Sequence, residues 1–235
     1  MVMKAVILAG GLGTRMVEET ATKPKPMVKI GEMPIIWHIM KIYASYGITD
    51  FIICSGYKSE IIKEFFEKYS ETWKVIVVDT GQETMTGGRL KKVEKFLDGE
   101  TFCFTYGDTL NDLNIKNLLK FHKKMKKLAT VTACIPPEKY GILKIDSDVV
   151  IDFIEKPIKE GEWVNGGFFV LEPEIFDYIA DDSTVWEKEP LQKLTKENQL
   201  AAYKHTGFYQ PMDTLSDKKN LEKLWKSENP SWKVW

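Results

Sequence analysis

A glycine-rich loop follows the first apolar segment of the chain, and basic residues lie close behind it. The segment reads VILAGGLGTR over residues 6–15, with glycine at three of the four positions 10–13 and arginine at position 15. A simple turn needs a single glycine, whereas several glycines let the backbone approach a ligand closely. Backbone N–H groups and the guanidinium of Arg15 can all bind phosphate oxygens. These residues therefore predict a binding site for a large anion.

The segment KPKPMVKIG over residues 23–31 supplies further cations. Its prolines favour an extended backbone, which would hold the side chain of Lys25 in a fixed position. Taken alone, such a segment is as consistent with a solvated turn as with a binding site. Its place directly after the glycine loop favours a second group of cations for the same anion.

Two familiar phosphate-binding motifs do not match this loop. A dinucleotide fingerprint that begins at Gly11 needs glycine at position 16, where this chain has Met16. A P-loop that begins at Gly10 needs glycine at position 15, where this chain has Arg15. The nature of the anion must therefore be inferred from other segments.

The segments around the loop predict an α/β fold with a mostly parallel sheet. Apolar runs typical of strands buried on both faces alternate with amphipathic runs typical of helices. We expect strands over 3–8, 50–56, 73–81, 101–108 and 129–135, and helices over 35–46, 58–69, 89–97 and 113–127. Because such sheets bind ligands at the carboxyl ends of their strands, the glycine loop after the first strand lies at the expected place.

The pattern changes after residue 136. Short strand-like segments follow over 142–146, 149–157 and 165–173, and we expect them to form a meander beside the main sheet. A last helix is expected to end near Ser227. We expect a single domain over 1–235, with βα units in 1–135, a β-rich elaboration in 136–215, and a C-terminal helix and tail in 216–235.

The composition narrows the class of protein. The chain has 235 residues, with 33 basic residues against 34 acidic ones, and this balance argues against a nucleic-acid partner. No apolar run approaches the roughly 18 residues of a membrane span, and the N-terminus lacks the pattern of a signal peptide. Cys54, Cys103 and Cys134 share no metal-binding spacing. We therefore expect a cytoplasmic protein with free thiols and no membrane partner.

A longer set of motifs carries a family resemblance. LAGGLGTR and KPKPMVKIG are followed in order by VDTGQETMTGGRLKKV, FTYGD, NGGFFVLEP, STVWEKEPL, GFYQPMDTL and PSWKVW. This series resembles the sugar-nucleotidyltransferase (nucleoside-diphosphate-sugar pyrophosphorylase) family, and within it most closely the glucose-1-phosphate cytidylyltransferases. The resemblance runs through nearly the whole chain. It implies a Rossmann-like fold with a mixed central sheet flanked by helices.

The resemblance also implies an activity. It is Mg²⁺-dependent transfer of a nucleotidyl group from CTP, or another nucleoside triphosphate, to a phosphorylated acceptor. With glucose 1-phosphate as acceptor, the products are CDP-glucose and pyrophosphate, for CDP-deoxysugars of surface polysaccharide. Members of the family tend to form homo-oligomers, so a homo-oligomer is expected here too.

The resemblance assigns roles to residues of this chain. Catalysis is assigned to Arg15, Lys25 and Asp108, and the Mg²⁺ ligands are Asp108 and Asp213. The nucleotide-binding residues are Leu8, Gly10, Gly11, Gly13, Thr14, Arg15, Lys25, Gly88 and Arg89. The acceptor-binding residues are Thr109, Gly141, Glu155, Lys156 and Asn165, with Lys156 on the acceptor phosphate and Glu155 and Asn165 on the sugar.

The chemistry of this reaction requires cations and metal-binding carboxylates of this kind. Two polyanions must approach each other, so positioning and neutralisation of charge can supply most of the rate without a covalent nucleophile. Single residues could instead serve the fold alone: Asp108 could cap a turn, Asp213 could be a helix N-cap, the pair Glu155 and Lys156 could be exposed, and Asn165 could serve a turn.

Two departures from the family keep alternatives open. The segment between the 58–69 helix and the VDTG strand is short, and Thr109 follows YGD where relatives carry a small glycine-bearing stretch. The first departure leaves open which base the protein selects and which oligomeric state it adopts. The second suggests a different sugar phosphate or a non-sugar phosphate as acceptor. A catalytically silent nucleotide-binding homologue is a third possibility.

Overall fold

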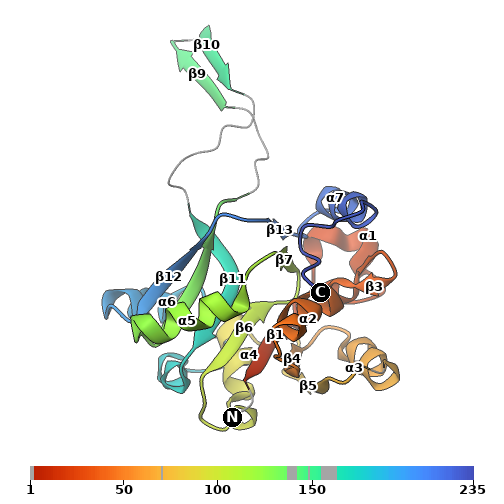
Figure 1. Cartoon of the computed structure of the whole chain (residues 1–235), viewed down its shortest axis with the longest axis vertical. Helices are drawn as coiled ribbons and strands as arrows, with labels where there is room; N and C mark the ends of the chain where they lie inside the picture. The colour runs from red at the N-terminus through yellow and green to blue at the C-terminus, as the bar shows by residue number, and fades with distance from the viewer. Residues whose placement is uncertain (1–2, 70, 137–141, 148, 155–162) are drawn as a thin grey trace.

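The computed structural model describes residues 3–69, 71–136, 142–147, 149–154 and 163–235. A seven-stranded sheet with the order β12-β8-β11-β6-β1-β4-β5 runs through the centre of the molecule (Figure 1). Its strands are β1 (Lys4–Ala9), β4 (Asp50–Ser55), β5 (Lys74–Asp79), β6 (Phe102–Tyr106), β8 (Ala129–Cys134), β11 (Val164–Leu171) and β12 (Leu200–His205). Neighbouring strands are parallel except at β11, which is antiparallel to both β6 and β8. The expected mixed, mostly parallel α/β sheet is confirmed.

Helices cover both faces of this sheet. Alternate residues of each central strand enter two separate cores, with Ala5 and Ile7 in one and Val6 and Leu8 in the other. The first core packs against α2 (Ile35–Ser45), α3 (Ser59–Lys68), α5 (Ile115–Met125) and α7 (Leu215–Trp225). The second packs against α4 (Thr86–Lys92) and α6 (Glu189–Lys196). Continuous apolar strands are therefore needed, because both faces of the sheet are buried.

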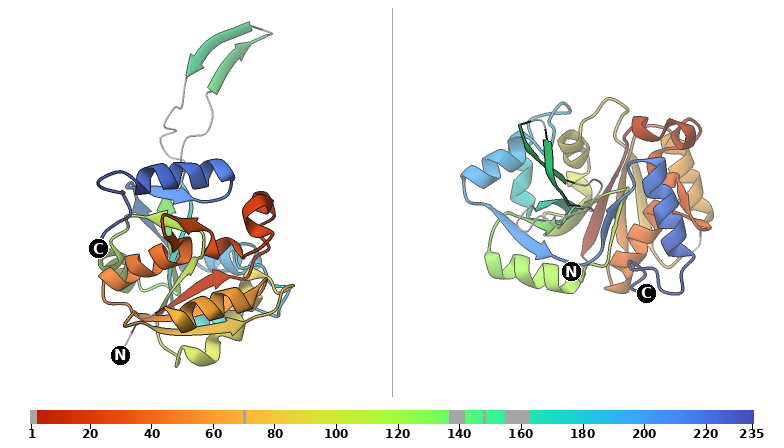
Figure 2. Two further views of the ribbon diagram at one scale, coloured as in Figure 1. Left: turned by 90° about the vertical axis from the view of Figure 1, so that its right-hand side faces the viewer. Right: turned by 90° about the horizontal axis from the view of Figure 1, so that it is seen from above.

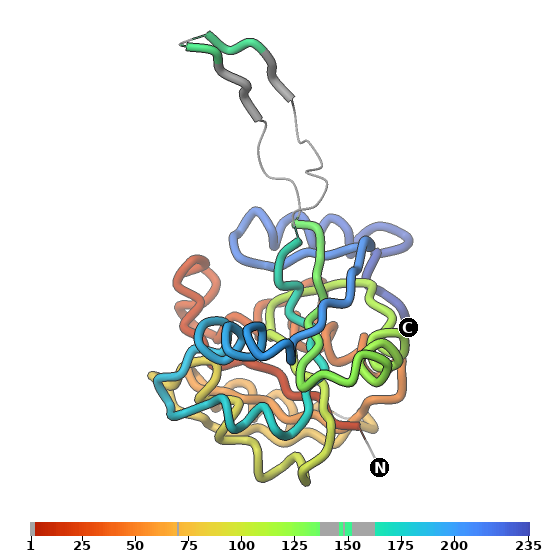
Figure 3. The backbone as a smooth tube through the Cα atoms, turned by 90° about the vertical axis from the view of Figure 1, so that its left-hand side faces the viewer, coloured from red at the N-terminus to blue at the C-terminus, as the bar shows by residue number. Residues whose placement is uncertain are grey.

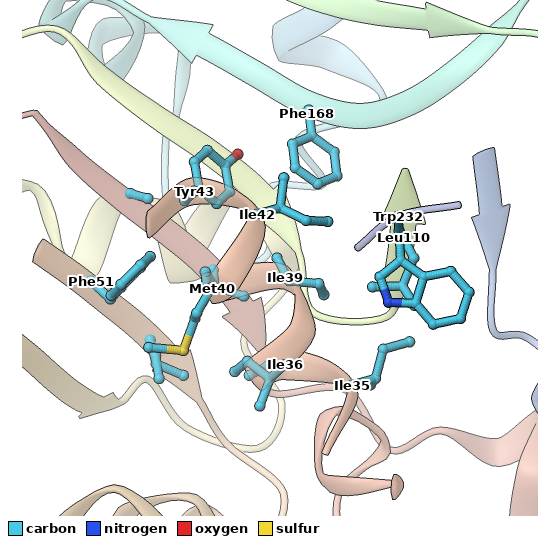
Figure 4. Packing of buried hydrophobic residues seen from close by; sticks show 14 of the residues in the cluster. Ile35, Ile36, Ile39, Met40, Ile42, Tyr43, Phe51, Leu110, Phe168 and Trp232 are labelled. Atoms are coloured by element: carbon cyan, nitrogen blue, oxygen red, sulfur yellow. The ribbon is translucent and has the colours of Figure 1, made fainter. Parts of the chain in front are cut away.

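Helix α2 forms the centre of the first core (Figure 4). Ile39, Met40 and Ile42 are fully buried, and the ring of Tyr43 stacks on Phe168 of β11 at 5.4 Å. The helix ends just before Gly47, whose φ of 85° is the left-handed conformation typical of a helix C-terminus. The expected end of this helix is confirmed.

The second half of the chain differs from the expectation. Residues 165–173 were expected in a meander beside the main sheet, but β11 lies inside that sheet between β6 and β8. The reason is that the run Phe168–Leu171 is apolar and fully buried, as a strand in the middle of a sheet covered on both faces must be. Strands β9 (Ile142–Asp146) and β10 (Val149–Ile154) form a hairpin of their own. This hairpin stands away from the body of the molecule (Figure 3).

Two short antiparallel pairs shape the carboxyl edge of the sheet. Strand β7 (Thr109–Asn111) pairs with β13 (Tyr209–Pro211), and β2 (Lys29–Ile30) pairs with β3 (Met33–Pro34). Beyond β13, α7 lies across the end of the body from which the hairpin projects (Figure 2). Its neighbour is the short helix α1 (Val17–Thr20). Lys218 of α7 forms an ion pair with Glu19 of α1. No helix in the described ranges is both long and apolar enough to cross a membrane.

Candidate active site

The glycine loop emerges at the carboxyl end of β1, between the carboxyl ends of its parallel neighbours β4 and β6. Gly13 has a φ of 65° and precedes a short 3-10 turn over Thr14–Met16. Gly10 has a packing reason of its own, because a Cβ there would lie 2.0 Å from a guanidinium nitrogen of Arg89. The loop is therefore shaped both by its backbone and by the buried arginine beside it.

A pocket of about 460 Å³ opens above this loop. It is lined by residues of four segments: 8–15, 25–26, 82–86 with Arg89, and 106–108. The sequence-predicted residues Leu8, Gly10, Gly11, Gly13, Thr14, Arg15, Lys25, Arg89 and Asp108 are all brought together in its wall. The volume lies within the usual range for small-molecule sites.

An ion cluster occupies one end of the pocket. The ammonium of Lys25 donates to Asp108 Oδ2 at 2.7 Å and to Asp213 Oδ1 at 2.8 Å. The guanidinium of Arg15 also contacts Asp213 Oδ1, at 2.9 Å. Burial lowers the pKa of Lys25, but the two carboxylates outweigh burial and raise this pKa above its ordinary value. Lys25 is therefore a buried, permanently positive group at the end of the pocket.

The pairing of β7 with β13 explains how residues so far apart in the sequence meet. The N–H of Met212 donates to the carbonyl of Asp108 at 2.9 Å, which places Asp213 beside Asp108. Asp213 is not the N-cap of the last helix: Thr214 takes that position and forms a capping box with Asp217. The alternative role considered for Asp213 is therefore wrong.

The two carboxylates fit a divalent cation. Mg²⁺ takes oxygen ligands and commonly binds through one or two carboxylates, with water and substrate phosphates as its other ligands. Asp108 and Asp213 share the Lys25 ammonium as a partner, and Asp213 also contacts Arg15. Across the described ranges there is no group of three or more His, Cys, Asp or Glu that could hold a metal. The pair thus suits an ion that is completed by substrate.

Thr109 lies beside this cluster rather than in the pocket wall. It is only 4% exposed, and its hydroxyl donates to Asp108 Oδ1 at 3.2 Å. The structure therefore gives Thr109 a contact with an acidic residue of the site. Its expected contact with the acceptor stays a prediction.

Gly88 and Arg89 have structural contacts in the fold. A Cβ at position 88 would lie 2.5 Å from the Cα of Asp182, so Gly88 allows close packing of α4 on that segment. The buried guanidinium of Arg89 donates to the carbonyls of Ser55 at 3.0 Å and Gly81 at 2.7 Å. Burial lowers the pKa of Arg89 from its ordinary value. Their direct contact with a nucleotide stays a prediction.

A hydrogen-bonded chain includes two residues that line the pocket, Tyr106 and Thr86, and sequence reasoning named only one of its members. The amide of Asn165 donates to Tyr106 Oη at 3.2 Å, and Tyr106 donates to Glu187 Oε1 at 2.6 Å. Thr86 donates to Glu187 Oε2 at 2.6 Å. Tyr106, Thr86 and Glu187 occur in the quoted motifs FTYGD, TGGRLKK and STVWEKEPL. That membership was the signal available in the sequence.

Three predicted acceptor residues, Gly141, Glu155 and Lys156, lie outside the described residues. Asn165 is described: it is exposed at the amino end of β11, and its Oδ1 accepts from the N–H of Gly167 at 2.9 Å. Because β11 is antiparallel to β6, its amino end lies at the same edge of the sheet as Asp108. The structure therefore brings Asn165 to the side of the pocket that holds Tyr106.

Comparisons with known proteins identify relatives of the whole chain. The chain is 51% identical to the glucose-1-phosphate cytidylyltransferase of Salmonella typhi, covering 99% of this chain and 100% of that protein. It is 41% identical, at 99% and 100% coverage, to a protein of Bacillus subtilis named probable glucose-1-phosphate cytidylyltransferase.

The fold has close structural neighbours as well. The crystal structure of HddC from Yersinia pseudotuberculosis superimposes with a TM-score of 0.77 at 26% identity, covering 96% of this chain and 100% of that one. The model of the nucleotidyl transferase family matches residues 4–230. The chain therefore belongs to the nucleotidyl transferase family.

Proposed function

We propose that this protein transfers a cytidylyl group from CTP to α-D-glucose 1-phosphate, with CDP-glucose and pyrophosphate as products. Full-length identity of 51% to a glucose-1-phosphate cytidylyltransferase supports the choice of substrates. The observation that carries the reaction class is the Lys25 ammonium, held between Asp108 and Asp213 at the end of a glycine-loop pocket. Such a site can bind two phosphorylated substrates and neutralise the negative charge of their phosphates where they meet.

In the proposed reaction, an oxygen of the acceptor phosphate attacks the α-phosphorus of CTP. A new phosphorus–oxygen bond forms, and the bond from the α-phosphorus to the bridging oxygen of pyrophosphate breaks. The positive charge of Lys25 and Arg15 favours the approach of two anions and stabilises the charge that develops on the phosphate oxygens. The N–H groups of the glycine loop orient the nucleotide.

Asp108 and Asp213 would hold a Mg²⁺ ion in this scheme. Enzymes of this family generally depend on a divalent metal. Bound there, the ion would supply positive charge to stabilise the negative charge of the phosphates. Thr109 donates to Asp108 and thereby orients one of the two carboxylates.

A second candidate is cytidylyl transfer to a different phosphorylated acceptor. The alignment with the Salmonella typhi enzyme spans 256 positions, more than the 235 residues of this chain, so that relative carries residues that this chain lacks. A local deletion can alter a substrate pocket while the catalytic groups stay in place. The side chain of Thr109 beside Asp108 is a second feature that favours a changed acceptor.

The deciding experiment is Mg²⁺-dependent pyrophosphate release over the four nucleoside triphosphates and a panel of phosphorylated acceptors. We expect the strongest signal with CTP and glucose 1-phosphate, and turnover reduced about 10²-fold or more in Asp108→Asn. A strong signal with CTP and another acceptor would favour the second candidate. No pyrophosphate release with any pair, with or without Mg²⁺, would instead support a nucleotide-binding homologue without activity.

A further inference from the structure

The carboxylate of Glu187 joins two walls of the pocket without lining it. One of its oxygens accepts from Tyr106 at 2.6 Å, and the other accepts from Thr86 at 2.6 Å. Tyr106 and Thr86 both line the pocket, on segments 20 residues apart in the sequence. Glu187 itself is half-buried behind them. A single charged group therefore holds both walls.

The chemistry of a carboxylate fixes the direction of every hydrogen bond in this chain. An ionised carboxylate can only accept, so the hydroxyls of both Tyr106 and Thr86 must donate to Glu187. The oxygen of Tyr106 is then an acceptor for the amide of Asn165, at 3.2 Å. The oxygen of Thr86 is an acceptor for the N–H of Trp186, at 2.9 Å.

Asn165 is fixed by the same argument. Its Oδ1 accepts from the N–H of Gly167 at 2.9 Å, so the amide nitrogen must face Tyr106. That nitrogen carries two N–H groups, and the contact with Tyr106 uses one of them. Asn165 is exposed, and its remaining N–H is a donor suited to a hydroxyl oxygen of the acceptor.

The other end of the chain reaches the segment 82–86, which lines the pocket. Thr86 begins α4, and the N–H groups of Met85 and Gly87 donate to the carbonyls of Asp182 and Thr184 at 2.8 and 2.9 Å. The position of Thr86 therefore depends on the segment 182–187. Burial and the Glu187 carboxylate also raise the pKa of Tyr106, which keeps its hydroxyl protonated as a donor.

We propose that Glu187 is a positioning residue that orients Tyr106 and Asn165 on the acceptor side and Thr86 on the nucleotide side of the pocket. This inference rests on the proposed function, since it assumes that the pocket binds both substrates. It assigns no chemical step to Glu187. Its effect is on substrate affinity and on the alignment of the two substrates.

The test compares Glu187→Gln, Tyr106→Phe and Thr86→Val, with turnover kinetics and with calorimetric titration of CTP and of glucose 1-phosphate. A glutamine at 187 keeps the shape but donates with its amide nitrogen, so one hydroxyl must reverse. We expect Glu187→Gln to raise KM and Kd for both substrates, each about tenfold for a lost charge-assisted hydrogen bond. Tyr106→Phe should mainly affect the acceptor, and Thr86→Val mainly CTP.

The double variant Glu187→Gln with Tyr106→Phe separates positioning from a general loss of stability. We expect its acceptor KM to be no higher than that of Tyr106→Phe alone, because both changes break the same chain. A matched control is Glu197→Gln, which removes the carboxylate that accepts from Tyr178 in another tyrosine pair, outside the pocket. This control should leave both KM values unchanged.

Two failures are distinguishable in this design. If Glu187→Gln binds both substrates like the wild type, or only lowers Tm with unchanged KM values, Glu187 has no positioning role and the inference is overturned. If the wild type releases no pyrophosphate with any pair, the proposed function fails, while the two titrations still decide whether Glu187 sets substrate affinity.

Discussion

At the scale of single residues, Lys25 is the centre of the site. It is only 8% exposed and is held by Asp108 and Asp213 at 2.7 and 2.8 Å. Its raised pKa means that the folded state binds this proton more tightly than the unfolded chain. The resulting stabilisation is fully present below the ordinary lysine value and is lost only as pH rises through the raised pKa. Lys25 is therefore positive at every physiological pH.

Replacement of Lys25 should affect catalysis and metal binding in opposite directions. Lys25→Met removes the cation that faces the phosphates, and we expect kcat to fall about 10²- to 10³-fold. The same change removes the ammonium that competes with a metal ion for both Asp108 and Asp213, while Arg15 still contacts Asp213, so Mn²⁺ should bind the substrate-free protein more tightly. Turnover assays and a Mn²⁺ titration by electron paramagnetic resonance check both effects. Lys23→Met is the matched control, and turnover like the wild type in Lys25→Met would contradict the prediction.

At the scale of elements, Arg89 ties together the ends of several strands. From α4 its guanidinium donates to the carbonyl of Ser55, the last residue of β4, and to those of Gly81 and Gln82 beyond β5. Gly10 and Gly56 leave the space for it, since a Cβ at either position would lie within 2.4 Å of its nitrogen. The shape of the glycine loop therefore depends on a residue of a distant helix.

Two neighbouring glycines test this dependence. Gly10→Ala should displace the Arg89 guanidinium, leave buried carbonyls without their donor and lower the free energy of unfolding by about 2–4 kcal/mol. Gly11→Ala is the control, because a Cβ at Gly11 meets nothing within 4 Å and should change stability little. Urea denaturation of the two variants gives the comparison. Equal stability of Gly10→Ala and Gly11→Ala would show that Arg89 does not need this space.

The elements also show what the sequence could and could not predict. β1, β4 and β6 were predictable because each is a mainly apolar run, and burial on both faces demands such a run. β8 reads ATVTAC and was predictable from its β-branched residues, which are typical of strands. The place of β11 was not, because a run like Phe168–Leu171 fits any central position, and pairing partners depend on the whole sheet. β12 was missed because Leu200–His205 is a mixed edge strand, with Ala201 its one buried residue.

The residues of the site also divide into those that local sequence predicts and those that it does not. The glycine loop, Arg15 and Lys25 lie close together in the sequence, and their residue types alone indicated an anion. Asp213 came only from the family resemblance, since the pairing of β7 with β13 that carries it to Asp108 leaves no local signal. Glu187 lies in the quoted motif STVWEKEPL, but the motif does not show its proposed role, because that role follows from two contacts with residues 81 and 101 positions away.

At the scale of the whole molecule, the C-terminal tail closes over α2. Trp232 is fully buried. The ring centroid of His38 lies 4.6 Å from that of Trp225 and 5.0 Å from that of Trp37. The Nε2–H of His38 donates to the carbonyl of Ile30 at 2.9 Å, so its Nδ1 accepts from Trp232 Nε1 at 3.4 Å. Burial lowers the pKa of His38 to about 4. The tail is thus packed on a neutral histidine.

This histidine should make the stability of the molecule depend on pH. Its folded pKa lies below its unfolded value, so the unfolded chain binds the proton first and the free energy of unfolding falls as pH drops from 6.5 towards 4. At pH 4.5 we expect a loss of about 2 kcal/mol relative to pH 7 that is absent in His38→Gln. Urea denaturation of both proteins at the two pH values measures it. The same pH dependence in both proteins would contradict the prediction.

The pairing of β8 with β11 has a consequence for changes in the length of the chain between them. The chain leaves the central sheet after Cys134 and returns at Val164, and these two residues are register partners in adjacent strands. Because both ends of the connecting segment are held by the pairing of β8 with β11, its length can vary with only a small change in loop-closure entropy. It also departs and returns at the edge of the sheet that carries the pocket. A relative with a longer or shorter segment between Cys134 and Val164 could therefore keep the pairing of β8 with β11 unchanged.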